Sequence, residues 1–141
     1  MCIRDRSKPD IICDVATLTG AAYVALGVEI GAVFSNNKKT LESFLDSNND
    51  AFENYHALPL EQSYKSLIKS EIADMKNSGG RFGGAITAAL LLEEFVDDLN
   101  WIHLDIAGPA RSRSSGSIYP EGGTGFGVLG YFNFLAREAN N

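Results

Sequence analysis

Two carboxylates, Asp14 and Asp105, are the first candidates for chemistry, because each lies near the carboxyl end of a predicted strand. Carboxylates in that position often bind metal ions. Two of them are too few for a di-metal site, which needs several oxygen ligands and bridging carboxylates. We therefore favour the interpretation that each accepts hydrogen bonds from backbone amides in the turn after its strand, and keep a metal role as the alternative.

The histidines and Arg81 have no catalytic motif around them, since H-E-x-x-H, C-x-x-C and G-x-S-x-G do not occur. His103 falls inside a predicted strand and is expected to be a neutral core histidine with one hydrogen bond rather than a metal ligand. His56 lies in a connecting segment and is expected to be exposed. Arg81 could bind an anion or pair with a carboxylate such as Asp74, and pairing is the preferred interpretation.

Two glycine-rich segments bear a partial likeness to phosphate-binding loops. Segment 125–130 reads GFGVLG and fits G-x-G-x-x-G, but it follows a polar loop instead of the strand that the motif needs. Segment 79–84 lacks the Lys-Ser/Thr pair of a P-loop. We interpret 125–130 as the start of a closely packed helix, with nucleotide binding as the alternative.

The elements that must position these residues alternate between strands and helices. Nearly continuous apolar runs predict strands over 11–16 and 31–35, and a two-residue alternation predicts a strand over 101–106. A 3.6-residue apolar period predicts a helix over 87–99. Its expected buried face consists of Ala88, Leu91, Leu92, Phe95, Val96 and Leu99.

Further helices are expected over 21–26, 41–52 and 61–70, with an extended segment over 56–60. A last helix is expected after Thr124, which is a suitable cap. Its expected buried stripe consists of Val128, Phe132, Leu135, Ala136 and Ala139. Strands that alternate with helices predict one layered α/β unit.

Composition and charge restrict the class of protein. The chain has 141 residues, of which 45% are hydrophobic and 21% charged, as in a globular domain. The formal net charge of −6 argues against nucleic acid as a main partner. The sequence contains no apolar run of about 18 residues, so no membrane span is predicted. Cys2 and Cys13 form no disulfide framework, so a reducing, cytoplasmic setting is the simpler interpretation.

The first seven residues, MCIRDRS, match nothing that follows and look like a translated sequencing adapter. We expect residues 1–7 to be a non-native leader and residues 8–141 to be the domain, or part of one. The alternative is that 1–7 form a short disordered basic tail.

Several ordered blocks resemble the carboxyl-terminal part of the leucyl (cytosol) aminopeptidase family. They are DVATLTGA at 14–21, NSGGR at 77–81, GGAITA at 83–88 and WIHLDIAG at 101–108. The resemblance covers about residues 8–137. It implies an α/β fold, namely a layered α/β/α sandwich with a mixed, largely parallel sheet, as a truncated catalytic domain.

The resemblance also implies a function. Members of the family are di-metal aminopeptidases that remove leucine-like amino-terminal residues from peptides, and they assemble as homohexamers. They use two divalent cations, such as Mn2+ or Zn2+, with a bicarbonate that assists attack by a metal-bound water. The Asn-Thr-Asp-Ala-Glu-Gly-Arg signature that bears several of the metal and catalytic groups is not in this sequence. We therefore expect no catalytic residue and no metal ligand in this chain.

What the resemblance assigns to this chain is the wall of the substrate pocket. The backbone at Leu18 and Gly20 would hydrogen-bond the peptide, and Ala110 is small, which would widen the pocket. The assigned substrate-binding residues are Thr17, Leu18, Gly20, Ala107 and Ala110. Tight turn packing is the alternative for these residues, and a non-enzymatic or nucleotide-binding α/β module is the alternative for the whole chain.

Overall fold

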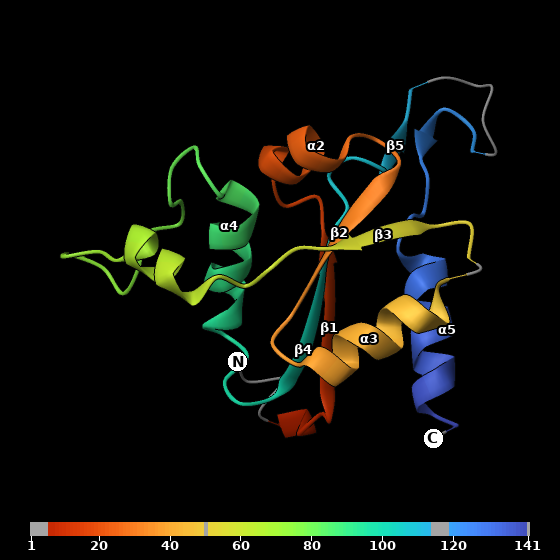
Figure 1. Cartoon of the computed structure of the whole chain (residues 1–141), viewed down its shortest axis with the longest axis horizontal. Helices are drawn as coiled ribbons and strands as arrows, with labels where there is room; N and C mark the ends of the chain where they lie inside the picture. Colours follow the sequence, from red (N-terminus) through yellow and green to blue (C-terminus); the bar gives the residue numbers. More distant parts are fainter. Residues whose placement is uncertain (1–5, 50, 114–118, 141) are drawn as a thin grey trace.

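A four-stranded sheet organises the chain, in the spatial order β1–β4–β2–β3 (Figure 1). The computed structural model describes residues 6–49, 51–113 and 119–140. Strand β4 pairs in parallel with β1 and antiparallel with β2, and β2 pairs in parallel with β3. The predicted mixed, largely parallel sheet is therefore confirmed. The strands are β1 (Ile11–Ala16), β2 (Ile30–Ser35), β3 (Asn54–Ala57) and β4 (Asn100–Asp105).

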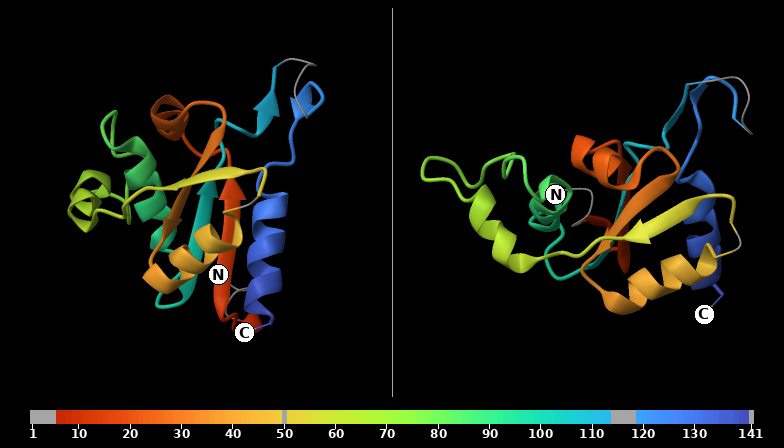
Figure 2. Two further views of the ribbon diagram at one scale, coloured as in Figure 1. Left: turned by 45° about the vertical axis from the view of Figure 1, so that its right-hand side comes forward. Right: turned by 45° about the horizontal axis from the view of Figure 1, so that its top comes forward.

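Helices cover both faces of the sheet, which makes the fold a layered α/β/α sandwich (Figures 1 and 2). One core joins α2 and α4 to the sheet through Ala22, Ala89, Phe34 and Trp101. The other joins α3 and α5 to the opposite face. The helices are α2 (Gly20–Leu26), α3 (Lys38–Ser47), α4 (Gly84–Glu93), α5 (Val128–Glu138) and the 3-10 helix η1 (Gln62–Ile68), and a small ribbon joins β5 (Arg111–Ser112) to β6 (Gly122–Gly123).

Aromatic packing holds α3 and α5 together over the sheet. The Phe44 ring is fully buried and meets the rings of Tyr55, Tyr131 and Phe134 edge-on, at centroid distances of 4.9, 5.8 and 5.7 Å. Edge-to-face arrangements at these distances are favourable. This cluster fixes the position of α5 against β3 and α3.

The predicted helix over 87–99 has the wrong bounds and the wrong buried face. Helix α4 ends at Glu93, and Val96, in the turn that follows, is the single buried member of the expected stripe. The buried residues of α4 itself are Ala85, Thr87, Ala89 and Leu90. Because the helix is apolar all round and packs against α2, η1 and the sheet, its periodicity does not identify a single buried face.

The predicted stripe of the last helix is also wrong, because α5 faces the core with its other side. Val128, Phe132 and Leu135 are 72%, 68% and 50% exposed, while Gly130 and Phe134 are buried. Tyr131 sets this rotation, since its hydroxyl lies within hydrogen-bond distance of the backbone carbonyls of Asp14 and Ile102, at 2.5 and 3.2 Å, and its one hydrogen can be donated to either. An apolar side of α5 is thus left at the surface.

Other expectations fall near the observed elements. The helix expected over 41–52 is α3, which begins earlier because the Asn37 side chain accepts a hydrogen bond from the Thr40 amide and caps it. His56 is exposed on β3, as predicted. Residues 1–5 of the expected leader lie outside the described residues. None of the described helices combines the length and apolarity needed to cross a membrane.

Candidate functional site

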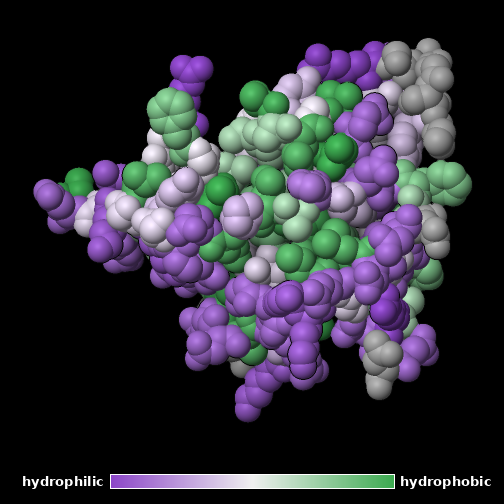
Figure 3. All heavy atoms as spheres, viewed as in Figure 1, coloured by the Kyte–Doolittle hydropathy of each residue, from purple (hydrophilic) through white to green (hydrophobic). Residues whose placement is uncertain are grey.

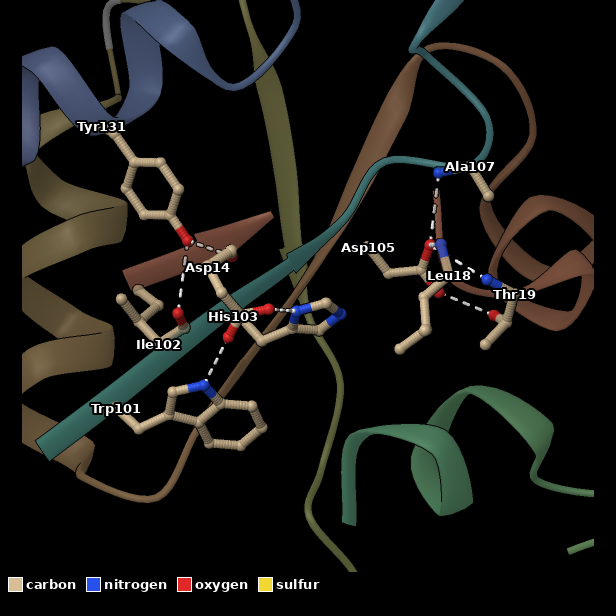
Figure 4. A network of polar contacts seen from close by, with 9 residues as sticks. All are labelled: Asp14, Leu18, Thr19, Trp101, Ile102, His103, Asp105, Ala107 and Tyr131. Carbon is tan, nitrogen blue, oxygen red and sulfur yellow. Dashed lines mark hydrogen bonds and ion pairs between the residues drawn. The ribbon is translucent and has the colours of Figure 1, made fainter. Parts of the chain in front are cut away.

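A buried carboxylate at the end of β4 organises a polar cluster beside the start of α2. Asp105 is 1% exposed, and its Oδ1 accepts hydrogen bonds from the amides of Leu18, Thr19 and Ala107 at 3.0, 3.3 and 3.2 Å (Figure 4). The parallel register places Ala16 beside Asp105, so the carboxyl ends of β1 and β4 meet there. The predicted hydrogen bonds from backbone amides to Asp105 are confirmed.

Thr19 ties the same cluster to helix α2. Its hydroxyl donates to Oδ2 of Asp105 at 2.7 Å and accepts from the amide of Ala22 at 2.9 Å, which caps the helix. A threonine cap satisfies one of the amides that a helix start leaves without a partner. The 17–20 turn, the start of α2 and the end of β4 are therefore held as one unit.

A groove of about 810 Å³ opens beside this unit, between α2 and the loop at 77–84, here called the glycine loop. Leu18, Gly20 and Val24 line one side, and the segment from Asn77 to Ala88 lines the other, except for Gly79. Figure 3 shows hydrophobic residues at the surface over α2. An open groove with a mostly apolar wall at the carboxyl end of parallel strands is a suitable place for a ligand.

Two glycines at the start of α4 bring the loop close to α2. Gly83 has a φ of 63°, a left-handed conformation that favours glycine. A Cβ at Gly84 would lie 3.1 Å from that of Ala21, tighter than ordinary contact. The glycine loop therefore allows α4 and α2 to approach each other at the floor of the groove.

The five residues assigned to the substrate wall are brought together only in part. Leu18 and Gly20 line the groove, Thr17 belongs to the same turn, and Ala107 reaches the turn through Asp105. Ala110 lies further along, where its amide donates to the Ile106 carbonyl. Within the described ranges the lining of this groove does not include Thr17, Ala107 or Ala110. A role in substrate binding stays a prediction for all five.

Asp14 makes a different set of contacts from the one expected. Its Oδ2 accepts from the Trp101 indole nitrogen at 2.5 Å, and its Oδ1 contacts Nδ1 of His103 at 2.5 Å (Figure 4). The prediction that Asp14 accepts hydrogen bonds from backbone amides is wrong. Asp14 lies within β1, directly opposite His103 in the strand pairing. Its side chain therefore meets the side chains of β4 and not the turn.

His103 is a core histidine with one hydrogen bond, as predicted. It is fully buried, and its ring lies 6.1 Å from that of Phe34 and 6.0 Å from that of Trp101. Its Nε2 has no hydrogen-bond partner among the described residues. The Phe34 and Trp101 rings and the Asp14 carboxylate therefore hold the imidazole in one orientation in the core.

The described residues do not supply a metal-ligand set. They contain no group of three or more His, Cys, Asp and Glu side chains that could hold an ion. Asp14 and Asp105 already use both of their oxygens in hydrogen bonds or close polar contacts with protein groups. Arg81 lines the groove; in the part of the chain that the structure describes, it does not form the expected ion pair with Asp74.

A second buried carboxylate, Glu53, occupies the start of α5. Glu53 is 4% exposed; its Oε1 accepts from the Gly127 amide at 2.9 Å and its Oε2 from the Gly130 amide at 2.7 Å. Tyr55 donates its hydroxyl to Oε2 at 2.5 Å. Two of the glycine amides of the G-x-G-x-x-G segment are thus bound by a carboxylate, which would repel a phosphate. This geometry favours the closely packed helix start over nucleotide binding.

The thiol of Cys13, in β1, should react slowly with alkylating agents. Burial, with a smaller contribution from the charge of Asp14, raises its pKa from 9.0 to about 11. Only the thiolate reacts, so its alkylation by iodoacetamide at pH 8 should be about 100-fold slower than that of an unperturbed thiol. Mass spectrometry of a Cys2→Ser variant, with glutathione as the reference thiol, measures this rate. A rate equal to that of glutathione would contradict the partial burial of Cys13.

One protein family matches almost the whole chain. The model for the cytosol aminopeptidase family, catalytic domain, matches residues 1–130. The chain belongs to this family. It is 50% identical over 134 residues to the probable cytosol aminopeptidase of Synechococcus sp. (strain CC9902), covering 94% of this chain and 27% of that protein. It is 52% identical over 134 residues to the probable cytosol aminopeptidase of Chlorobium phaeobacteroides, covering 94% and 26%.

Solved structures of the family have the same fold. A mutant of tomato leucine aminopeptidase superposes with a TM-score of 0.88 at 37% identity, covering 96% of this chain and 26% of that one. The bottromycin maturation enzyme BotP gives a TM-score of 0.92 at 36% identity, covering 99% and 31%. The chain therefore spans only a quarter to a third of the length of these family members.

Proposed function

We propose that this chain is the part of an aminopeptidase catalytic domain that forms one wall of the substrate groove. The observation that carries the proposal is the groove beside the Asp105 cluster, at the joint carboxyl ends of β1 and β4. Its lining includes Leu18, Ala21 and Val24, which suit an apolar, leucine-like side chain at the amino terminus of a peptide.

In this proposal the backbone of Leu18 and Gly20, which line the groove, hydrogen-bonds the peptide. Thr17, Ala107 and Ala110 do not line the groove itself and would border the first side chain of the substrate from the adjoining turns. The hydrolytic ions would be two divalent cations, Mn2+ or Zn2+, held by other parts of the protein, with bicarbonate as an aid. BotP has been solved in complex with Mn, which supports manganese. The complete protein would be a cytoplasmic homohexamer.

A hybrid enzyme tests the proposal. Residues 8–137 replace the matching segment of the Synechococcus relative, and hydrolysis of leucine p-nitroanilide is measured with Mn2+. We expect kcat/KM of the hybrid to lie within about tenfold of the parent value. That limit corresponds to a loss of at most about 1.4 kcal/mol in transition-state binding. We expect no turnover by the 141-residue chain alone.

Two outcomes would contradict the proposal. One is a hybrid with native circular dichroism and oligomeric state but no activity, because the segment would then not form the groove wall. The other is robust metal-dependent activity of the chain alone, because the chain would then hold the ions itself.

A further inference from the structure

We propose that Asp105 is a positioning residue for substrate binding: its buried carboxylate fixes the 17–20 turn, and with it the wall of the groove. The inference rests on the proposed function and deepens it. Asp105 does not itself line the groove; it acts through the residues that it holds.

The geometry concentrates four hydrogen bonds on one side chain. Oδ1 accepts three backbone amides and Oδ2 accepts the Thr19 hydroxyl, so both oxygens are used. Hydrogen bonds to an ionised carboxylate are about twice as strong as neutral ones. The amides of Leu18 and Ala107 come from the turns after β1 and β4, and one oxygen atom therefore sets the distance between those two turns.

The groups that Asp105 holds are those that shape the groove. Leu18 and Thr19 line the groove directly, and Gly20 follows them in the chain. Thr19 also caps α2, whose residues Ala21 and Val24 continue the same wall. Loss of the carboxylate should therefore let both the turn and the start of α2 move.

Glu53 offers a matched control within the same chain. It is also a buried carboxylate that accepts two backbone amides and one hydroxyl, but its partners are Gly127, Gly130 and Tyr55. None of these partners is among the described residues that line the groove. A purely structural role for Asp105 predicts that Asp105 and Glu53 variants behave alike.

The experiment compares Asp105→Asn and Glu53→Gln in the hybrid enzyme, at a temperature where both remain folded. For Asp105→Asn we expect KM for leucine p-nitroanilide to rise about tenfold or more, with a smaller change in kcat. For Glu53→Gln we expect a lower melting temperature and a KM within about twofold of the unmodified hybrid. Equal KM values for the two variants would overturn the proposal.

A second pair of variants serves if Asp105→Asn does not fold. Thr19→Val removes the hydroxyl that donates to Asp105, whereas Thr19→Ser keeps it. We expect Thr19→Val to raise KM and Thr19→Ser to restore it to within about twofold. An unchanged KM in Thr19→Val would count against the proposal.

Hydrogen–deuterium exchange separates this inference from the proposed function, because it needs no activity. In the 141-residue chain, Asp105→Asn should speed exchange at the amides of Leu18, Thr19 and Ala107 and leave Gly127 and Gly130 unchanged. Glu53→Gln should do the reverse. If the hybrid is inactive but this pattern appears, the groove assignment fails while the anchoring by Asp105 stands. Uniformly faster exchange in both variants would overturn the anchoring.

Discussion

Replacing Gly108 with alanine should destabilise the chain by about 3 kcal/mol, the upper part of the range for overpacking a core position. Gly108 is buried just after β4, and an added Cβ would overlap the backbone carbonyl of Gly27. That carbonyl has little freedom to withdraw. Gly27 ends α2 with a positive φ of 76°, which favours glycine, and its amide donates to the Tyr23 carbonyl at 2.9 Å.

Urea unfolding followed by tryptophan fluorescence measures this effect. Trp101 is the sole tryptophan and is fully buried, so its emission reports the folded sheet. Gly123→Ala is the control, because a Cβ there meets nothing within 4 Å. We expect the control to change the free energy of unfolding by less than about 0.5 kcal/mol. A Gly108→Ala variant as stable as the control would show that the turn after β4 does not lie against the end of α2.

Replacing Glu53 with glutamine should cost about 2–3 kcal/mol, because a buried hydrogen-bonding group loses its charged partner. The carboxylate accepts from Gly127, Gly130 and Tyr55, and it lies at the positive end of α5. Glutamine keeps a single oxygen and turns an NH2 group toward groups that donate. At least one buried donor is then left without an acceptor.

The same unfolding assay measures the Glu53 variant. Glu71→Gln is the matched control, since Glu71 is exposed and the substitution is the same. We expect Glu71→Gln to lie within about 0.5 kcal/mol of the unmodified chain. If the two glutamine variants unfold at the same urea concentration, Glu53 does not hold the start of α5.

The buried strands could be predicted from the sequence, because burial leaves a local pattern in them. Both β1 and β4 carry apolar runs or alternation within six residues, and their predicted bounds nearly match. The helix faces could not be predicted in the same way. Helix α4 is apolar on all sides, and the orientation of α5 depends on Tyr131 reaching two strand carbonyls, a contact that no local period encodes.

In the candidate site, too, some contacts could be predicted from the sequence and others could not. Asp105 stands at a strand end followed by small residues, so its hydrogen bonds to turn amides could be predicted from its position. Glu53 could not be found, because the amides that it binds lie 74 and 77 residues further along the chain. Its one local signal is a charged residue just before an alternating strand, which is too common to be informative. The contacts of Asp14 could not be predicted either, because side-chain contacts across β1 and β4 depend on the register between distant strands.

The long separation between the 17–20 turn and Asp105 has a consequence for synthesis. The Leu18 amide and its acceptor are 87 residues apart, and the parallel pairing of β1 with β4 spans a similar length. Closing a loop of that length costs about 4 kcal/mol of chain entropy before any contact repays it. During translation, β1 therefore cannot pair with β4 until residues 100–105 have left the ribosome. The groove wall should become ordered only after β4 has been synthesised.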